Sequence, residues 1–388
     1  MADGKVALVL SGGGARGAYE AGALSVLLPE LERRGERPTI YVGTSVGAYN
    51  AAFAAAHAHR PLDEALGEAV EMWETLHWRD VLSPLVSPRG LVRSLRYLGR
   101  LLWVKRPRID SLLYTDPLPA TLDRIVSFEQ LRRNVEDGTV SAAAVSTTSA
   151  HSSRTVVFHA GGPNPERDTV RGIDYVGTPL TEDHVQASGA IPSLFPAVHV
   201  ASPERARGWY FDGGTRLNTP IKPALELGAD RVVVIGLASI QPGPDDLASD
   251  DRPDVFEGAA QLLQALLIDR LEQDVRELAE ENLPGHEGRK IPYIFVSPRE
   301  RLGIGRIASE IWRERYAGLR GFLHDKDLST LGRFNAAGNG PVHGELLSFL
   351  FFAPEFARAL VEMGRADARH WLSQEHSDGP WRLGPPPD

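Results

Sequence analysis

Two apolar runs near the beginning of the chain are each followed by a glycine-containing turn and by a segment typical of a helix. The first run, Val6 to Leu10, ends at Ser11-Gly12-Gly13-Gly14-Ala15-Arg16-Gly17. The second run, Ile40 to Val42, ends at Gly43-Thr44-Ser45-Val46-Gly47 and leads into the alanine-rich segment Ala48 to Ala58. Continuously apolar strands that alternate with helices are typical of a parallel sheet. Two such units in succession therefore predict an α/β fold with crossover helices.

The second turn has the Gly-x-Ser-x-Gly pattern of a nucleophile elbow, in which a serine stands on a tight turn between a strand and a helix. Gly43 and Gly47 suit this geometry, because such a turn strains the serine backbone and brings strand and helix close together. In a chain with 38 glycines, the motif carries little weight alone. Ser45 is our candidate nucleophile, and the rest of the sequence has to supply its partners.

The first turn supports two interpretations. Gly12-x-Gly14-x-x-Gly17 between a strand and a helix also satisfies the dinucleotide-binding fingerprint. That fingerprint needs an acid about 20 positions later, at the end of the second strand. This strand ends at Gly43-Thr44-Ser45, and Glu30, Glu32 and Glu36 fall on or just after the first helix. Backbone N–H groups at a helix N-terminus can also bind the oxyanion of acyl transfer, and a serine at the next strand end favours that use.

A second candidate site residue follows a short aromatic run. Trp209-Tyr210-Phe211 predicts a strand that ends at Asp212-Gly213-Gly214. Asp-Gly is also common in type I′ hairpin turns, but Thr215 to Pro220 does not alternate as a returning strand would. We therefore place Asp212 in a site, and we expect its aromatic neighbours to exclude water and raise its pKa. We expect the small, apolar segment Ala187 to Pro196 to form a pocket wall.

The remaining patterns extend the sheet and cover it with helices. Further strands are predicted at 140–147, 154–159, 231–236 and 291–296. Helices are predicted at 59–80, as a cover on the sheet, and at 256–282, 344–352 and 355–372. We expect a loop from 161 to 177 and a frayed tail at 379–388, which contains four prolines.

Residues 89–108 form a basic segment with seven arginines and lysines and no acid. At helical spacing, Arg89, Arg93, Arg96 and Arg100 fall on one face, and the leucines of the segment lie almost opposite. Two interpretations stay open. The segment is either a solvated helix that packs its leucines on the core, or a lid or membrane-surface contact.

Composition excludes several classes of protein. A net charge of −9 argues against general nucleic-acid binding. The absence of cysteine excludes disulfides, thiolate metal sites and a cysteine nucleophile. No apolar run reaches the roughly 18 residues of a membrane-spanning helix, and the N-terminus lacks a signal-peptide pattern. We therefore expect a soluble, cytoplasmic protein, with residues 89–108 as the candidate for a peripheral membrane contact.

Three of these motifs, in this order, resemble the motif set of patatin-like phospholipases: the Ser11–Gly17 loop, the Gly43–Gly47 turn and Asp212-Gly213-Gly214. Asn218-Thr219-Pro220 and the Ala187–Pro196 segment are also similar to family sequence, so the resemblance covers about residues 5–223. His343-Gly344-Glu345-Leu346-Leu347 resembles bacterial members. The resemblance implies a three-layer α/β/α fold with a mostly parallel sheet. It also implies a serine–aspartate dyad that hydrolyses lipid acyl esters without a metal or organic cofactor.

The resemblance assigns expected roles by motif match. Ser45 would be the nucleophile, Asp212 the base, and the oxyanion hole would consist of Gly12, Gly13 and Gly14. The other motif glycines are Gly17, Gly43, Gly47, Gly213 and Gly214. Arg16, which matches the family's loop arginine, would hold a phosphate or brace the loop. The expected partner is a lipid or ester substrate.

Two alternatives to the dyad stay open. One is a nonhydrolytic nucleotide- or phosphate-binding module that uses the Gly12–Gly17 loop. The other is a triad with His286, His324 or His343, because most hydrolases with a Gly-x-Ser-x-Gly motif order their residues Ser, Asp, His.

The length of 388 residues allows one large domain with an extension. We expect residues 5–240 to form the patatin-like α/β hydrolase core. Residues 241–388 are expected to form a C-terminal extension packed on the same core, mostly helical with one further strand near 291–296.

Overall fold

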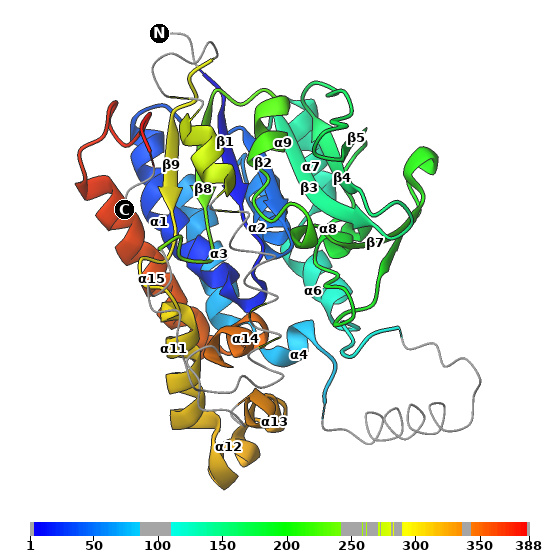
Figure 1. Cartoon of the computed structure of the whole chain (residues 1–388), viewed down its shortest axis with the longest axis vertical. Helices are drawn as coiled ribbons and strands as arrows, with labels where there is room; N and C mark the ends of the chain where they lie inside the picture. Colours follow the sequence, from blue (N-terminus) through cyan, green and yellow to red (C-terminus); the bar gives the residue numbers. More distant parts are fainter. Residues whose placement is uncertain are drawn as a thin grey trace.

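The computed structural model describes residues 4–85, 110–241, 258, 261, 271, 273–280, 282, 289–335 and 343–385. Within these residues, nine strands form one sheet (Figure 1). Seven of them follow the order β5-β4-β3-β2-β1-β8-β9, while β7 pairs with β3 and β6 pairs with β7. The strands are β1 (Val6–Leu10), β2 (Ile40–Thr44), β3 (Ala142–Ser149), β4 (Thr155–Gly161), β5 (Ile173–Gly177), β6 (Val198–Val200), β7 (Gly208–Asp212), β8 (Arg231–Ile235) and β9 (Tyr293–Val296).

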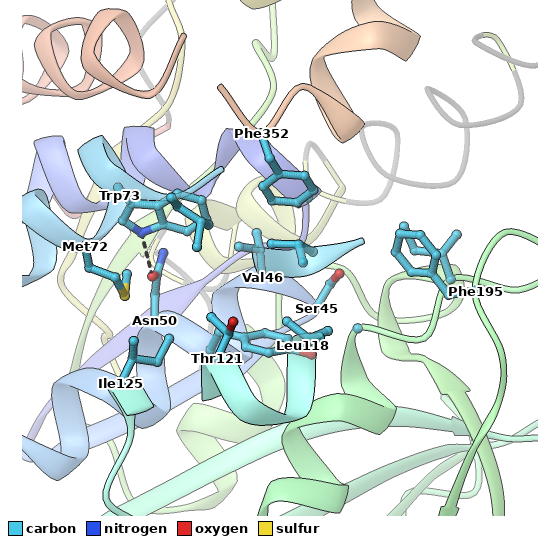
Figure 2. Close-up of a pocket in the computed structure, with 16 residues that line it drawn as sticks. Ser45, Val46, Asn50, Met72, Trp73, Leu118, Thr121, Ile125, Phe195 and Phe352 are labelled. Atoms are coloured by element: carbon cyan, nitrogen blue, oxygen red, sulfur yellow. Dashed lines mark hydrogen bonds between the residues drawn. The ribbon is translucent and has the colours of Figure 1, made fainter. Parts of the chain in front are cut away.

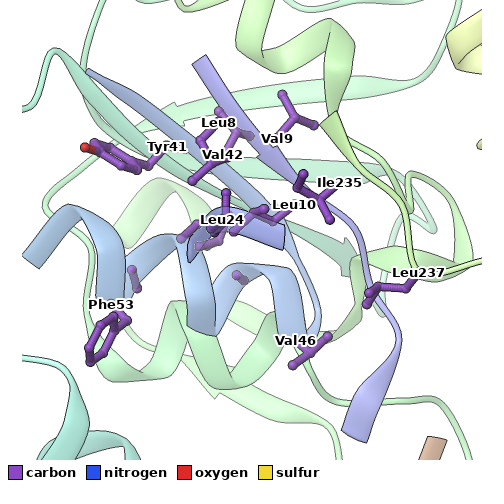
Figure 3. Close-up of a cluster of buried hydrophobic side chains, with 14 of the residues drawn as sticks. Leu8, Val9, Leu10, Leu24, Tyr41, Val42, Val46, Phe53, Ile235 and Leu237 are labelled. Atoms are coloured by element: carbon purple, nitrogen blue, oxygen red, sulfur yellow. The ribbon is translucent and has the colours of Figure 1, made fainter. Parts of the chain in front are cut away.

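The centre of the sheet is parallel, as the two strand–turn–helix units predicted. Strands β3, β2, β1, β8 and β9 run in the same direction. Strand β4 is antiparallel to β3, which confirms the predicted hairpin of 140–147 and 154–159. The central strands β1 and β2 are buried along their whole length, which explains their uninterrupted apolar sequences. Figure 3 shows their side chains, including Leu8, Leu10 and Val42, packed against helices.

Helices cover both faces of the sheet. They are α1 (Gly17–Arg33), α2 (Val46–Ala56), α3 (Leu62–Thr75), α4 (Trp78–Val81), α6 (Leu118–Ile125), α7 (Phe128–Glu136), α8 (Glu182–Ser188), α9 (Ile221–Glu226), α11 (Gly303–Ile311), α12 (Gly318–His324), α13 (Lys326–Asn335), α14 (His343–Leu350) and α15 (Pro354–Ser373). Short 3₁₀ turns occur at η1 (Gly14–Arg16), η2 (Glu204–Ala206) and η3 (Gly213–Thr215), and a π-helical turn, η4, spans Trp312–Tyr316.

The strand order decides which helix covers which face. The chain moves from β1 through β2 to β3 in one direction across the sheet, by way of α1 and α2. It then returns past β1 to β8, with α9 directly before β8. Right-handed crossovers place α1 and α2 on one face and α9 on the other, where α9 packs on β1 and β2. The predicted three-layer α/β/α fold is confirmed.

The C-terminal part packs on the first layer of helices. Strand β9 pairs with β8 and extends the sheet, while α15 lies along α1 and α14 contacts η1. Helix α3 also packs on α1 and α15. The helix predicted at 59–80 is present as α3 and α4, and α3 makes its main contacts with other helices.

Two sequence predictions need correction. Residues 161–177 are not a loop throughout, because Ile173–Gly177 form strand β5, which is parallel to β4. This edge strand is half-buried, so it lacks the apolar alternation that marks an inner strand. The tail is not frayed at Trp381, which is fully buried. Its indole N–H donates to Glu36 Oε2 over 2.9 Å, and the Arg231 guanidinium lies 5.2 Å from the ring centre.

Two predicted helices lie mainly or wholly outside the described residues. Residues 273–280 of the predicted 256–282 helix are described and helical. The basic segment 89–108 lies outside the described residues. Within the part of the chain that is described, no helix combines the length and apolar character needed to cross a bilayer.

Candidate active site

Ser45 occupies a strained turn between β2 and α2. Its backbone has φ 53° and ψ −127°, a conformation that non-glycine residues rarely adopt. A Cβ on Gly43 would overlap with the backbone of Gly47, and one on Gly47 would overlap with the carbonyl of Leu10. Both glycines of the motif are therefore required by close packing of strand and helix. The Ser45 N–H donates to Ser188 Oγ over 2.9 Å, which fixes the turn from α8.

Strand β3 brings Asp212 to this serine. On β3, Ser146 pairs with Thr44 of β2, and the next residue, Thr147, pairs with Asp212 of β7. The end of β2 and the end of β7 therefore meet on the same edge of β3. As a result, Ser45 Oγ donates a hydrogen bond to Asp212 Oδ2 over 2.6 Å, although the residues are 167 positions apart.

The surroundings of Asp212 favour a carboxyl group that titrates near neutrality. Asp212 is buried, and burial raises its pKa to about 7, against the opposing effects of hydrogen bonds from Ser45 and the Gly214 N–H. The Gly214 N–H donates to Asp212 Oδ1 over 2.6 Å. Gly213 lies so close to the Ser146 carbonyl that a Cβ would overlap with it. Both motif glycines thus hold the acid in place.

The three aromatic residues expected to exclude water from Asp212 differ in exposure. Tyr210 is buried, but Trp209 is 57% exposed, so its ring does not shield the carboxylate. Asp212 is also enclosed by its own strand pairing and by the chain after α8, where the Ala190 carbonyl accepts its N–H over 2.8 Å. Tyr49, one turn after Ser45 on α2, has a buried hydroxyl, and the nearby Asp212 contributes to raising the pKa of this phenol.

The glycine loop lies directly against the serine. A Cβ on Gly12 would be 2.9 Å from Ser45 Cβ. The Gly12 N–H donates to Asn218, over 3.3 Å to its carbonyl and 3.1 Å to Oδ1, so it is not free to bind an oxyanion. The N–H groups of Gly13 and Gly14 donate to no acceptor among the described residues. Of the three predicted oxyanion donors, these two remain available.

Arg16 connects this loop to the C-terminal helices. Each of its three guanidinium nitrogens donates: Nε to Ser348 Oγ over 2.8 Å, Nη1 to the Leu237 carbonyl over 3.2 Å, and Nη2 to the carbonyl and carboxylate of Glu345 over 2.9 and 2.6 Å. The guanidinium also lies 3.9 Å from the centre of the Phe349 ring. The side chain is only 2% exposed. Of the two expected roles, its contacts match bracing of the loop.

Glu345 links the brace to the next helix. Its second carboxylate oxygen accepts the Gly305 N–H of α11 over 2.8 Å. The segment His343–Leu347 resembles family sequence, but nothing in its local pattern predicts a role for Glu345. Glu345 and Arg16 are 329 positions apart, and no local pattern predicts their contact. The same is true of Ser188, whose hydroxyl both supports the serine turn and donates to the Ser146 carbonyl.

A largely apolar cavity opens beside the serine. The serine cavity, as we name it, has an empty volume of about 670 Å³, part of it open to solvent. Ser45 lies at one end of it and Asn50 farther along α2, with Val46 between them (Figure 2). Gly189, Ile191 and Phe195 line the cavity, so the predicted pocket wall at 187–196 is confirmed. Gly17, the last glycine of the first loop, lies nearby, where a Cβ would overlap with Val46 and Trp73.

The alternatives to the dyad find little support in this geometry. A dinucleotide site needs an acid at the end of β2, but the chain there leads directly into Ser45. Glu36, one of the nearby acids, pairs with Arg231. Of the three histidines considered for a triad, His286 lies outside the described residues, the His324 ring packs on Tyr316, and His343 begins α14. Among the described residues, no group of three or more histidine, aspartate or glutamate side chains could hold a metal.

The solved structures that match this chain are distant from it in sequence. VipD from Legionella pneumophila is 16% identical, with 76% of this chain and 61% of that chain covered and a TM-score of 0.28. Human GIVD cytosolic phospholipase A2 is 13% identical, with 95% of this chain and 60% of that chain covered and a TM-score of 0.38. The chain thus spans about three fifths of the length of these proteins. A search of curated protein sequences gave no match.

A family profile matches the part of the chain that includes both Ser45 and Asp212. The profile of the family described as "Patatin-like phospholipase" matches residues 8–225, which is more than half of the 388-residue chain. The matched region contains the glycine loop, the serine turn and the acid strand described above. The resemblance drawn from these three motifs is therefore confirmed, and the chain belongs to the patatin-like phospholipase family.

Proposed function

We propose that this protein is a serine hydrolase that cleaves carboxylic esters of lipids, of the phospholipase A, lysophospholipase or esterase type. Membership of a phospholipase family supports a lipid acyl hydrolase in general. The observation that carries the finer proposal is the 2.6 Å hydrogen bond from Ser45 Oγ to the buried Asp212 carboxylate, at the end of an apolar cavity. A serine hydroxyl, a buried carboxylate and an apolar cavity thus occur together, and their proximity supports the proposal.

In the proposed reaction, Asp212 Oδ2 takes the proton from Ser45 as Oγ attacks the ester carbonyl carbon. A serine hydroxyl is a poor nucleophile, and a carboxylate with an ordinary pKa near 4 is a weak base. The raised pKa of Asp212, about 7, makes it a stronger proton acceptor. The carbonyl oxygen then carries the negative charge of the tetrahedral intermediate. The Gly13 and Gly14 N–H groups are the donors proposed to receive it.

The second half of the reaction uses the same groups. When the intermediate collapses, the C–O bond to the alcohol breaks, and Asp212 returns its proton to the departing oxygen. The acyl group remains on Ser45 as an ester. Water then attacks this ester, with Asp212 again as the base, and releases a carboxylic acid and free Ser45. Asp212 makes every proton transfer in these steps.

Release of fatty acid from phospholipid vesicles, and of nitrophenol from p-nitrophenyl esters, tests this proposal. We expect the wild-type protein to hydrolyse at least one of these substrates and Ser45→Ala to lose the activity completely, because no other described residue supplies the attacking oxygen. Circular dichroism checks that Ser45→Ala is folded. Ester hydrolysis that persists in a folded Ser45→Ala variant would contradict the proposed nucleophile.

The pH dependence of hydrolysis tests the proposed base. Only the ionised form of Asp212 can accept a proton, and its pKa is raised to about 7 by burial. We therefore expect kcat/KM for a neutral ester to rise about tenfold per pH unit below pH 7 and to level off above it. If kcat/KM instead rose with a midpoint near the ordinary aspartate pKa of about 4, the pH dependence of hydrolysis would not be set by the raised pKa of Asp212.

A further inference from the structure

A second apolar cavity lies farther along α2 and α3, which both contribute residues to the lining of the serine cavity. This rear cavity has an empty volume of about 590 Å³, part of it open to solvent. Its lining from α1 includes Leu24 and Leu28, and its lining from α3 consists of Leu62, Ala65, Leu66 and Ala69. Of the described residues, Asn50 is the one that lines both cavities.

The two cavities follow one another along α2 and α3, and we call the two together the groove. The residues of α2 that line the two cavities, together with His57 directly after the helix, share one helical face: Val46, Tyr49, Asn50, Phe53, Ala54 and His57. The first three face the serine cavity and the last three the rear cavity, with Asn50 common to both. On α3 the order is reversed, since Met72, Trp73 and Leu76 line the serine cavity. The helices therefore run antiparallel along a groove that continues away from Ser45.

A buried polar contact divides this groove. The Trp73 indole N–H donates to Asn50 Oδ1 over 3.0 Å, which joins α3 to α2 across the groove (Figure 2). Asn50 Nδ2 donates to Glu20 Oε2 over 2.7 Å and to the Gly17 carbonyl over 3.1 Å. Asn50, Trp73 and Glu20 are all buried. Burial also raises the pKa of Glu20 well above its ordinary value, against the opposing effect of the hydrogen bond from Asn50.

We propose that the Asn50–Trp73 contact sets the length of acyl chain that the enzyme accepts, by closing the serine cavity against the rear cavity. This inference rests on the proposed function, since it takes the acyl chain of the Ser45 ester as the occupant. The continuity of the groove with Ser45 is the reason for choosing this occupant. An acyl chain that extends from an ester on Ser45 Oγ enters the serine cavity first and meets Asn50 at the far end of this cavity.

The dimensions of the groove support a limit on acyl-chain length at Asn50. From Val46 to Asn50 the α2 axis advances roughly 6 Å, and from Val46 to His57 roughly 16 Å. Figure 3 shows Val46 and Phe53 well apart along this helix. A chain that displaced the Asn50–Trp73 contact would leave a buried amide oxygen and an indole N–H without partners, which is unfavourable in an apolar site. The contact therefore excludes longer chains from the rear cavity.

The test compares kcat/KM for p-nitrophenyl esters from butyrate to palmitate in the wild-type protein and in Asn50→Ala. Each additional methylene that becomes buried is worth a factor of about four in affinity. We expect the wild type to prefer the shorter esters, and Asn50→Ala to raise the palmitate-to-butyrate ratio of kcat/KM by about tenfold or more. Trp73→Phe, which removes the indole N–H and keeps an apolar ring, is expected to shift the ratio in the same direction.

A matched double variant shows whether the higher palmitate-to-butyrate ratio of Asn50→Ala depends on the rear cavity. Ala69 lines that cavity alone, so Ala69→Leu in the Asn50→Ala background is expected to fill it and reverse the gain. Two results would overturn the inference and leave the hydrolase proposal in place. One is a palmitate-to-butyrate ratio of kcat/KM that is unchanged in folded Asn50→Ala and Trp73→Phe. The other is a wild-type protein whose kcat/KM for palmitate equals that for its best shorter ester. Absence of hydrolysis of every ester by the wild type would overturn the proposed function and this inference with it.

Discussion

Asp212→Asn is expected to abolish ester hydrolysis and, at the same time, to raise the thermal stability of the protein above pH 7. Asparagine fits the same space, with its oxygen able to accept the Gly214 N–H and its amide group able to donate to Ser45 Oγ. It cannot accept a proton from Ser45. Loss of a general base lowers the rate by about 10²–10⁴-fold, so we expect a decrease of at least about 100-fold in kcat.

The gain in stability follows from the raised pKa of Asp212. The pKa is about 7 in the folded protein and 3.8 in the reference state, so between these values the folded protein holds a proton that the unfolded chain has released. The contribution of this proton to stability is present at low pH and is lost as the pH rises through 7. Above pH 7 the folded protein carries a buried charge, at a cost on the order of a few kcal/mol. Asparagine avoids that cost.

Thermal unfolding at about pH 5 and about pH 8 measures this effect. The Tm of Asp212→Asn should exceed that of the wild type by a few degrees at the higher pH, and the difference should shrink at the lower pH. Asp174→Asn is the matched control, because Arg154 and Arg167 lower the pKa of Asp174, so its loss should decrease stability at the higher pH. Equal stability of Asp212→Asn and wild type at both pH values would contradict a buried, pKa-shifted Asp212.

Gly14→Ala is expected to lower kcat by about 10²–10³-fold, the effect of losing one oxyanion donor. Gly14 has φ +60°, which favours glycine, and a Cβ there would overlap with the carbonyl oxygen of Phe349. Phe349 belongs to α14, which Arg16 holds in place through Ser348 and Glu345. The loop therefore has to move away from α14, and it carries its N–H groups out of position as it moves.

Gly35→Ala is the matched control for this experiment. Gly35 also has a positive φ, +71°, but a Cβ there would meet no atom within 4 Å. It should show the modest stability loss of a strained alanine, about 1–2 kcal/mol, and keep full activity. Full activity in a folded Gly14→Ala variant would show that the Gly13 and Gly14 N–H groups do not stabilise the transition state.

The parts of the site that the sequence predicts are those encoded by neighbouring residues. The serine turn, the glycine loop and the Asp-Gly-Gly strand end each have a local backbone requirement, and the glycines that meet it are visible in the sequence. The central strands are visible because both of their faces are buried. The pairing of Ser45 with Asp212 could be expected only because the resemblance joined the motifs. The physical reason for it is the register of β3, in which Ser146 and Thr147 bind the two strand ends.

The parts that could not be predicted depend on contacts between distant segments. Glu345, which holds Arg16, and Ser188, which holds the serine turn, lie in segments that resemble family sequence, but no local pattern predicts the contacts they make. Trp381 lies in a proline-rich tail but is buried between Glu36 and Arg231. Gly12 carries the motif of an oxyanion donor, yet Asn218 occupies its N–H. In each case the partner is more than 140 positions away and is chosen by packing.

The most direct test of the central claim, that Asp212 activates Ser45 as a nucleophile, is labelling with an alkyl fluorophosphonate followed by mass spectrometry of the peptides. We expect one label per chain, on Ser45. The labelling rate should rise with pH through about 7 in the wild type and be at least about 100-fold lower in Asp212→Asn. Folded wild-type protein that takes up no label at Ser45, or an Asp212→Asn variant that is labelled at the wild-type rate, would contradict this claim.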